Sequence, residues 1–399
     1  MTMGGAVFFL TFWAAVSESG SASRMTRASQ PVLSGHRASA QPNLLGQPGL
    51  FPGRLLTLLG RLAPGRNTGA LSILYSCTPR PRMKLFRMRQ PAGYPVALRL
   101  LLWVWPALAT GQALPHQTGK IPTEQVALAY EAFGARSSAP PLLVVNGGPG
   151  LSHAYLLPTD VWKQLAQKRR VIFYDQRGTG ASKPVRAGAP QTLAAQVADL
   201  EAVRQGLNLP QVMLLGDSYG GLLSIAYASA YPEHVAKLIL SDAAGSNLNT
   251  LVHLFEEVFP ETMAAEKRQK QPPGDAQAAA EASLRTHFNL LFYSTAQRDA
   301  YFRKLGPIRN VGLEPAVGQA VGDDAGKADF TPKLAGFAFP TLVLTGRYDM
   351  NVAPLTAWRL QQAIPGAKIV FFEQSGHFPW FEEPIKYRKV VEQFLDAPR

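Results

Sequence analysis

Short apolar, β-prone runs alternate with helical segments from residue 126 to the end of the chain. Each run is about four to eight residues long, which is typical of buried strands. The predicted strands are 126–133, 142–145, 171–174, 212–215, 237–240, 341–344 and 368–372, and the predicted helices are 193–207, 222–230, 355–363 and 386–395. Alternation of this kind predicts an α/β protein with a mostly parallel central sheet flanked by helices.

The stretch 243–336 interrupts this alternation. It contains a cluster of glutamates at 256–261, then a segment rich in Lys and Gln, then more helical sequence. Loops longer than about 15 residues without structure of their own are uncommon in compact domains. We therefore predict an inserted helical cap at 243–336 between two parts of the core, 114–242 and 337–399; two long excursions from the core are the alternative.

Residues 1–82 are rich in Arg, Pro, Ser and Gly and lack a sustained periodicity, so we expect them to be disordered or not translated. Basic residues after Met83 precede a short apolar run at 100–109, which is the layout of a secretory signal peptide within 83–113, cleaved after Ala109 or, as the second candidate, after Ala113. The apolar run is well short of the roughly 20 residues that span a bilayer. We expect an exported protein, periplasmic or secreted, without a stable membrane anchor; the protein would be cytoplasmic if the leader is not functional.

The formal net charge of +13 would suggest a nucleic-acid or anionic-membrane partner, but the charge is unevenly distributed. Residues 1–123 contain 13 Lys and Arg and a single acid, Glu18, whereas residues 124–399 contain 27 basic and 26 acidic residues. The globular part is nearly neutral, so no nucleic-acid partner is expected. The single cysteine, Cys77, lies in the leader, and the mature protein is expected to have no disulfide or thiol chemistry.

A serine nucleophile is indicated by the segment Gly216-Asp-Ser-Tyr-Gly220, which follows a predicted strand and precedes a predicted helix. This is the G-x-S-x-G pattern of the α/β-hydrolase fold, in which a tight strand-to-helix turn exposes the serine. The turn imposes a strained backbone on the nucleophile, and the glycines on both sides leave room for it. Because a neutral hydroxyl attacks poorly, Ser218 requires a general base and an acid that orients the base.

The general base and its orienting acid are predicted at the ends of the last two strands. In this fold the chain order is serine, acid, histidine. Asp349 follows the sixth predicted strand and is the expected acid, whereas His377 follows the seventh and is the expected base, with a glycine before it that lets the loop approach Ser218. Asp242 also ends a strand and remains an alternative acid.

Two backbone N–H groups are predicted to form the oxyanion hole that stabilises the tetrahedral intermediate. One belongs to Tyr219, and the other to Gly148 in the segment 146–150, which follows the second predicted strand. A simple turn is the alternative for this Gly-Pro segment. The glycines match neither the phosphate-binding nor the dinucleotide-binding pattern, and no cluster has metal-ligand spacing, so we expect no cofactor and no metal.

The segment 175–182 follows the third predicted strand. We expect it to be a hydrogen-bonded loop that braces the floor of the active site, with a substrate contact by Arg177 as the alternative. His153 has no visible acid partner in the sequence, so it is expected to be a surface or packing residue.

Together these motifs resemble the proline iminopeptidase (prolyl aminopeptidase) family of α/β-hydrolases over roughly residues 120–398. The resemblance implies a serine aminopeptidase that releases N-terminal residues from short peptides through an acyl-enzyme. It also implies that glutamates of the cap bind the free α-amino group of the substrate. The segments that carry the resemblance are Gly147-Gly-Pro-Gly-Leu-Ser-His-Ala-Tyr155, Phe173-Tyr-Asp-Gln-Arg-Gly178, Gly216-Asp-Ser-Tyr-Gly-Gly221, Gly346-Arg-Tyr-Asp349 and Ser375-Gly-His377.

The candidate amine-binding residues are Glu314 first, then Glu256, Glu257 and Glu261. An ammonium group that enters a partly dehydrated pocket requires a compensating carboxylate. At least one of these glutamates is therefore expected to face the site.

Three positions depart from the pattern of the family. Asn146 stands where members often have His, Tyr219 where many have Trp, and Met350 where some have Glu. The same fold and triad serve many acyl substrates. A carboxylesterase or lactonase-type enzyme that acts on small acyl substrates therefore remains the second hypothesis, and the oligomeric state is not predicted.

Overall fold

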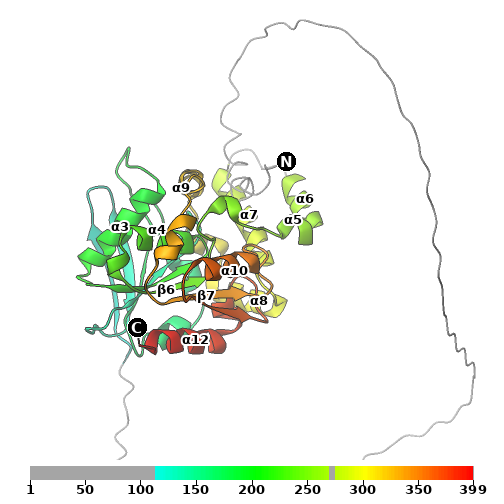
Figure 1. The fold of residues 1–399 in the computed structure, drawn as a ribbon. Coiled ribbons are helices and arrows are strands. Elements are labelled where there is room, and N and C mark those ends of the chain that lie inside the picture. Colours follow the sequence, from blue (N-terminus) through cyan, green and yellow to red (C-terminus); the bar gives the residue numbers. More distant parts are fainter. Residues whose placement is uncertain (1–112, 269–274, 399) are drawn as a thin grey trace, which may run out of the picture. The chain divides into compact units, whose positions relative to one another are not determined.

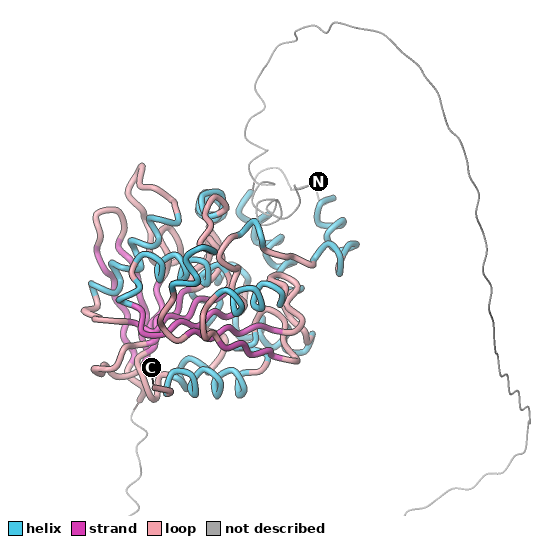
Figure 2. The backbone as a smooth tube through the Cα atoms, in the orientation of Figure 1, coloured by secondary structure: helices cyan, strands magenta, loops and turns pink. Residues whose placement is uncertain are grey.

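The computed structural model describes residues 113–398 except 269–274. The predicted leader at 1–82, Cys77 and all of the predicted signal peptide except Ala113 lie outside the described residues. An eight-stranded sheet with the order β1-β2-β4-β3-β5-β6-β7-β8 forms the centre of the described part (Figures 1 and 2). Its strands are β1 (His116–Pro122), β2 (Ala127–Phe133), β3 (Leu142–Val145), β4 (Val171–Tyr174), β5 (Val212–Asp217), β6 (Val235–Ser241), β7 (Thr341–Gly346) and β8 (Lys368–Phe372).

The sheet is mostly parallel, as predicted. Strand β2 runs antiparallel to both β1 and β4, and all other neighbouring strands pair in parallel. The sequence did not predict β1, because Ile121 is the only buried residue of this edge strand and the apolar alternation that marks a strand is missing.

Two hydrophobic cores cover the two faces of the sheet, because successive strand residues point to opposite faces. Helices α3 (Leu193–Gly206), α4 (Tyr219–Ala230) and α10 (Pro354–Ala363) pack on one face, and α2 (Val161–Leu165) and α12 (Pro384–Asp396) pack on the other. Figure 1 shows α12 below the strands and α3, α4 and α10 above them. The four longer helices were predicted to within a few residues, and α2 was missed because it has only five residues.

The segment 243–336, which we call the cap segment, contains five α-helices among its described residues. Leu284 and Phe288 join the core that contains α12, whereas Val321 joins the core that contains α3. The cap segment therefore packs against both sides of the molecule. No helix in the described part of the chain is both long and apolar enough to cross a membrane. The helices of the cap segment are α5 (Phe255–Val258), α6 (Pro260–Arg268), α7 (Ala276–Leu290), α8 (Thr295–Leu305) and α9 (Pro315–Ala325).

Three of the predicted site residues follow the carboxyl ends of parallel strands. Ser218 follows β5, Asp349 follows β7 and His377 follows β8. In open α/β sheets this is the edge at which ligands bind.

Candidate active site

Ser218 occupies a strained turn between β5 and α4. Its backbone has φ 55° and ψ −123°, a conformation that residues other than glycine rarely adopt. A Cβ atom on Gly216 would lie 2.4 Å from the carbonyl oxygen of Gly220, and one on Gly220 would lie 2.1 Å from that of Val145. The two glycines therefore permit the turn by allowing α4 to begin in close contact with β5 and β3.

His377 and Asp349 form a buried hydrogen-bonded pair. The Nδ1–H of His377 donates to Asp349 Oδ2 at 2.7 Å, which fixes the tautomer with the lone pair on Nε2. Asp349 Oδ1 accepts from the backbone N–H groups of Asn351 and Val352, both at 2.9 Å. Burial alone would lower the pKa of His377, but the charge of Asp349, the hydrogen bond to it and the charge of Asp217 together raise it above its ordinary value.

Asn351 lies beside the reactive nitrogen of His377. Its Nδ2 atom is 3.3 Å from Nε2, which is an acceptor in this tautomer. Both residues line the same pocket as Ser218. The side-chain amide therefore lies at the nitrogen that would take up a proton in acid–base catalysis.

Asp242 lies close to this pair but is bonded elsewhere. Its Oδ1 accepts from the N–H of Gly346 at 2.8 Å, and Ser241 Oγ donates to Oδ2 at 3.2 Å. Burial and then the charge of Asp349 raise the pKa of Asp242 well above its ordinary value. The structure thus bonds the imidazole to Asp349 and not to the alternative acid.

The same three side chains also have the spacing of a cation site. Ligand atoms of Asp242, Asp349 and His377 lie within 4.8 Å of one another, a grouping found once in the described part of the chain. The hydrogen bond between His377 and Asp349 uses the facing atoms of both residues. Because the facing atoms already bond to each other, these three side chains are better suited to orienting the imidazole than to binding a metal ion.

We expect Asp349→Asn and Asp242→Asn to differ sharply. The first leaves the imidazole without its acceptor and lowers kcat for an activated ester by about ten-thousand-fold. The second changes a carboxyl group that is bonded to Gly346 and Ser241 and not to the imidazole, and it lowers kcat by less than about tenfold. Steady-state kinetics of the two variants measure this, and a larger loss in Asp242→Asn would reverse the assignment of the acid.

The loop that carries His377 is bonded to the cap segment. The N–H of His377 donates to the carbonyl of Leu291 at 2.7 Å. The buried carboxylate of Glu382 accepts from the N–H groups of Gly376 at 2.7 Å and Ser294 at 3.0 Å, and burial raises the pKa of Glu382 to about 7. Sequence reasoning missed Glu382, although an acidic pair directly after the histidine loop was a visible signal.

Gly148 lies beside Ser218 on the wall of the pocket. The N–H of the preceding Gly147 already donates to the hydroxyl of Tyr155 at 2.6 Å, so Gly148 is the glycine whose N–H can serve a substrate oxygen. The hydroxyl of Tyr155 in turn donates to Asp217 Oδ2 at 2.6 Å. Burial raises the pKa of Asp217 to about 6, although the charge of His377 and the hydrogen bond from Tyr155 act in the opposite direction.

The side chain of Tyr219 points away from the substrate side of the turn. It is fully buried in the core that contains α3, so only the backbone N–H of Tyr219 is suited to the oxyanion role predicted for it.

The loop at 175–182 braces the site, as the sequence favoured. Arg177 Nε and Nη2 donate to the two carboxylate oxygens of Asp199 at 2.6 and 2.7 Å, and both side chains are buried. Arg177 does not line the pocket with Ser218, so the alternative of a substrate contact is wrong for this structure.

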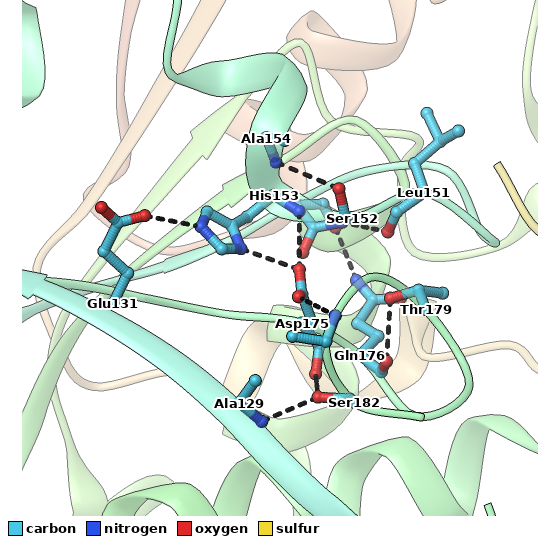
Figure 3. Close-up of polar contacts among 12 residues, drawn as sticks. Ala129, Glu131, Leu151, Ser152, His153, Ala154, Asp175, Gln176, Thr179 and Ser182 are labelled. Atoms are coloured by element: carbon cyan, nitrogen blue, oxygen red, sulfur yellow. Dashed lines mark hydrogen bonds and ion pairs between the residues drawn. The ribbon is translucent and has the colours of Figure 1, made fainter. Parts of the chain in front are cut away.

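The sequence shows no acid partner for His153, which was expected to be a surface or packing residue, but the structure gives it two. His153 Nδ1 lies 2.8 Å from Asp175 Oδ1 and Nε2 lies 3.1 Å from Glu131 Oε2 (Figure 3). Both partners are 22 residues away, one in each direction, so no local pattern reveals them. Burial would lower the pKa of His153, but the two carboxylates raise it to about 9.

Because its pKa is raised from 6.5 to about 9, His153 stabilises the fold fully below pH 6.5, and this contribution is lost as the pH rises through about 9. We expect His153→Gln to lower the free energy of unfolding by about 3 kcal/mol near pH 6 and by much less near pH 10. Chemical denaturation of wild type and variant at both pH values tests this. An equal loss at the two pH values would contradict the charged pairing.

The pocket above Ser218 is mostly apolar. Its polar side chains are Ser218, His253, His287, Asn351 and His377. No acidic residue is among the described residues that line it. The other lining residues are Gly148, Pro149, Leu151, Tyr155, Phe255, Leu284, Phe288, Leu291, Leu313 and Phe378.

The structure does not bring the predicted cap glutamates into this pocket. The carboxylate of Glu314 is paired with Lys183, and only its backbone approaches the glycine loop, where its N–H donates to Gly150 at 2.8 Å. Glu256, Glu257 and Glu261 are exposed in the first turns of α5 and α6.

An acid that sequence reasoning missed lies behind the lining. Glu266 Oε1 is 3.4 Å from Nδ1 of His287 and also accepts from the hydroxyl of Ser283. Glu266 is the acidic partner of a lining side chain in the cap segment, but nothing in its sequence surroundings distinguishes it from the neighbouring glutamates.

Comparison with known proteins adds to this geometry. The chain matches the alpha/beta hydrolase fold family over residues 140–384. It is 31% identical over 290 residues to the proline iminopeptidase of Lactobacillus helveticus, covering 70% of this chain and 97% of that protein. It is 29% identical over 280 residues to the proline iminopeptidase of Saccharolobus solfataricus, covering 67% and 88% respectively. An esterase (EaEST) from Exiguobacterium antarcticum shares the fold, with a TM-score of 0.55 and 18% identity over 70% of this chain and 98% of that one.

Proposed function

The chain belongs to the proline iminopeptidase family of α/β-hydrolases, and on that basis we propose that it is a serine aminopeptidase that releases N-terminal residues from short peptides. The observation that carries the proposal is the arrangement of Ser218 and the hydrogen-bonded pair of His377 and Asp349 around one apolar pocket. Nucleophile, base and orienting acid are the parts that acyl transfer requires.

In the proposed reaction, Ser218 Oγ attacks the carbonyl carbon of the first residue while His377 Nε2 takes the hydroxyl proton. The N–H groups of Gly148 and Tyr219 stabilise the negative oxygen of the tetrahedral intermediate. His377 then gives its proton to the leaving amine, and the acyl group remains on Ser218. A water molecule, deprotonated by His377, releases the acyl group in the same manner.

The lining of the pocket supports a small apolar first residue. Phe255, Phe288 and Phe378 together with four leucines surround the space next to Ser218. A ring such as that of proline would remove apolar surface from water here, and exclusion of water also strengthens the electrostatic interactions around the intermediate.

Recognition of the amine is assigned to His287 with Glu266 behind it. His287 Nδ1 is 3.0 Å from the carbonyl of Ser283 and 3.4 Å from Glu266, so Nδ1 carries the proton and Nε2 is the acceptor. Nε2 of His287 can accept a hydrogen bond from an ammonium group. The carboxylate of Glu266, on the other side of the ring, supplies the compensating negative charge.

A second candidate is a carboxylesterase or lactonase-type enzyme acting on small acyl substrates. It is favoured by one observation, the lack of a carboxylate among the described residues that line the pocket. A neutral acyl substrate needs no such charge, whereas a free amine does.

The two candidates are separated by blocking the amine. We expect the full chain to cleave a prolyl arylamide at least about a hundredfold more efficiently than its N-acetylated form, because a buried hydrogen bond to a charged group is lost. Ser218→Ala should abolish both reactions. Equal turnover of the free and blocked compounds, with a high ratio of ester to arylamide efficiency, would favour the esterase instead.

The amine site is tested by changing its two members. We expect His287→Leu and Glu266→Gln to raise KM for the prolyl arylamide by about tenfold to a hundredfold and to leave hydrolysis of a neutral nitrophenyl ester nearly unchanged. Glu257→Gln is the matched control, because it removes an exposed carboxylate of the same segment. Unchanged KM in both variants would exclude this assignment.

A further inference from the structure

A row of three hydrogen bonds connects the two loops that carry the proposed oxyanion donors. The hydroxyl of Tyr219 donates to Gln196 Oε1 at 2.8 Å. Gln196 Nε2 donates to Gln176 Oε1 at 3.3 Å, and Gln176 Nε2 donates to the carbonyl of Asn146 at 2.7 Å. The row therefore begins at the residue after Ser218 and ends two residues before Gly148.

All the groups of this row are buried. Asn146 and Tyr219 are 0% exposed, and Gln176 and Gln196 are each 1% exposed. Burial raises the pKa of Tyr219 well above its ordinary value, so the hydroxyl keeps the proton that it donates. Every donor points in the same direction along the row, and hydrogen bonds aligned in this way polarise and strengthen one another.

The row has a counterpart on the other side of Ser218. Asp217, the residue before the nucleophile, is connected through the hydroxyl of Tyr155 to the N–H of Gly147. The two neighbours of Ser218 are thus bonded through side chains to two successive residues of the glycine loop. Displacement of that loop relative to the turn would break hydrogen bonds on both sides.

A purely structural role would not require this chemistry. Two amide side chains in an interior must satisfy their hydrogen bonds or destabilise the fold, and apolar residues of similar volume fill such space without that requirement. The row instead joins the two backbone segments whose separation determines whether both N–H groups reach one oxygen atom. Catalysis by such donors is sensitive to displacements well below 1 Å.

We infer that Gln176 and Gln196, together with the hydroxyl of Tyr219, are positioning residues that fix the spacing of the two oxyanion donors. The inference rests on the proposed serine chemistry at Ser218, but on neither candidate substrate. It concerns groups that do not touch the substrate and act through the backbone of the two loops.

The chain offers a matched pair of variants for the test. Tyr219 and Tyr227 lie on the same helix, both are 0% exposed, and the hydroxyl of each donates at 2.8 Å to a side chain of α3, Gln196 and Glu201 respectively. Tyr219→Phe and Tyr227→Phe therefore each delete one buried hydroxyl between the same two helices. Only the first interrupts the row.

We expect Tyr219→Phe to lower kcat for a nitrophenyl ester by about tenfold with KM changed less than about twofold, because the loss falls on the transition state. Its affinity for a phenylboronic acid, which forms a tetrahedral adduct with an active serine, should fall by the same factor. Tyr227→Phe should leave kcat and boronate affinity unchanged within about twofold. Urea denaturation of both variants measures how much stability each hydroxyl deletion removes.

Gln196→Leu provides a second variant. It breaks two links of the row, and the double variant with Tyr219→Phe should be no slower than Gln196→Leu alone, since both changes interrupt one connection. If Gln196→Leu does not fold, the single hydroxyl deletion at Tyr219 still decides the question.

Unchanged kcat and boronate affinity in Tyr219→Phe, or equal losses in Tyr227→Phe, would overturn the inference. A wild-type protein that neither hydrolyses the ester nor binds the boronic acid would refute the serine chemistry itself and this inference with it. The ester and boronate readouts do not depend on peptide cleavage, so failure as an aminopeptidase and failure of the positioning row give different results.

Discussion

The arrangement of the site depends on how closely helix α4 begins against strands β3 and β5. At Gly220 the helix backbone approaches the carbonyl oxygen of Val145 so closely that a Cβ atom there would lie 2.1 Å away. This contact forces Ser218 into a positive φ and places the two loops that follow β3 and β5 next to each other. The backbone of Ser218 and the closeness of the loops that carry the proposed oxyanion donors thus follow from one steric constraint, which the glycines of the turn make possible.

Around that contact, buried polar groups hold the loops. The charged pairing of His153 with Glu131 and Asp175, the bidentate pairing of Arg177 and the bond from Ser294 to Glu382 each connect separate segments of the chain. Such groups are costly to bury unless they are fully bonded, and a fully bonded network favours one arrangement over its alternatives. Polar bonds therefore contribute more to holding the loops at the carboxyl ends of the strands than to holding the two apolar cores.

The sequence revealed the parts of the molecule that local patterns encode. Buried parallel strands are continuous apolar runs, and Ser218 lies in a pattern of five residues, so seven strands and the strained turn at Ser218 could be predicted. Strand β1 could not, because it is exposed and polar. The partners of His153 could not either, since they lie on β2 and after β4 and meet it only through the tertiary fold.

The sequence could not show which glutamate of the cap segment faces the pocket. It shows that an acid is present, but the direction of the side chain depends on the tertiary fold. Glu314 pairs with Lys183, a residue 131 positions away, and so is not directed at the pocket.

The bond between the N–H of His377 and the carbonyl of Leu291 has a mechanical consequence. Together with the carboxylate of Glu382, which bonds both Gly376 and Ser294, it makes the histidine loop and this end of the cap segment a single rigid piece. Any opening of the cap segment at this end would carry His377, the proposed general base, away from Ser218. An entrance widened at Leu291 would therefore be inactive while it stays open.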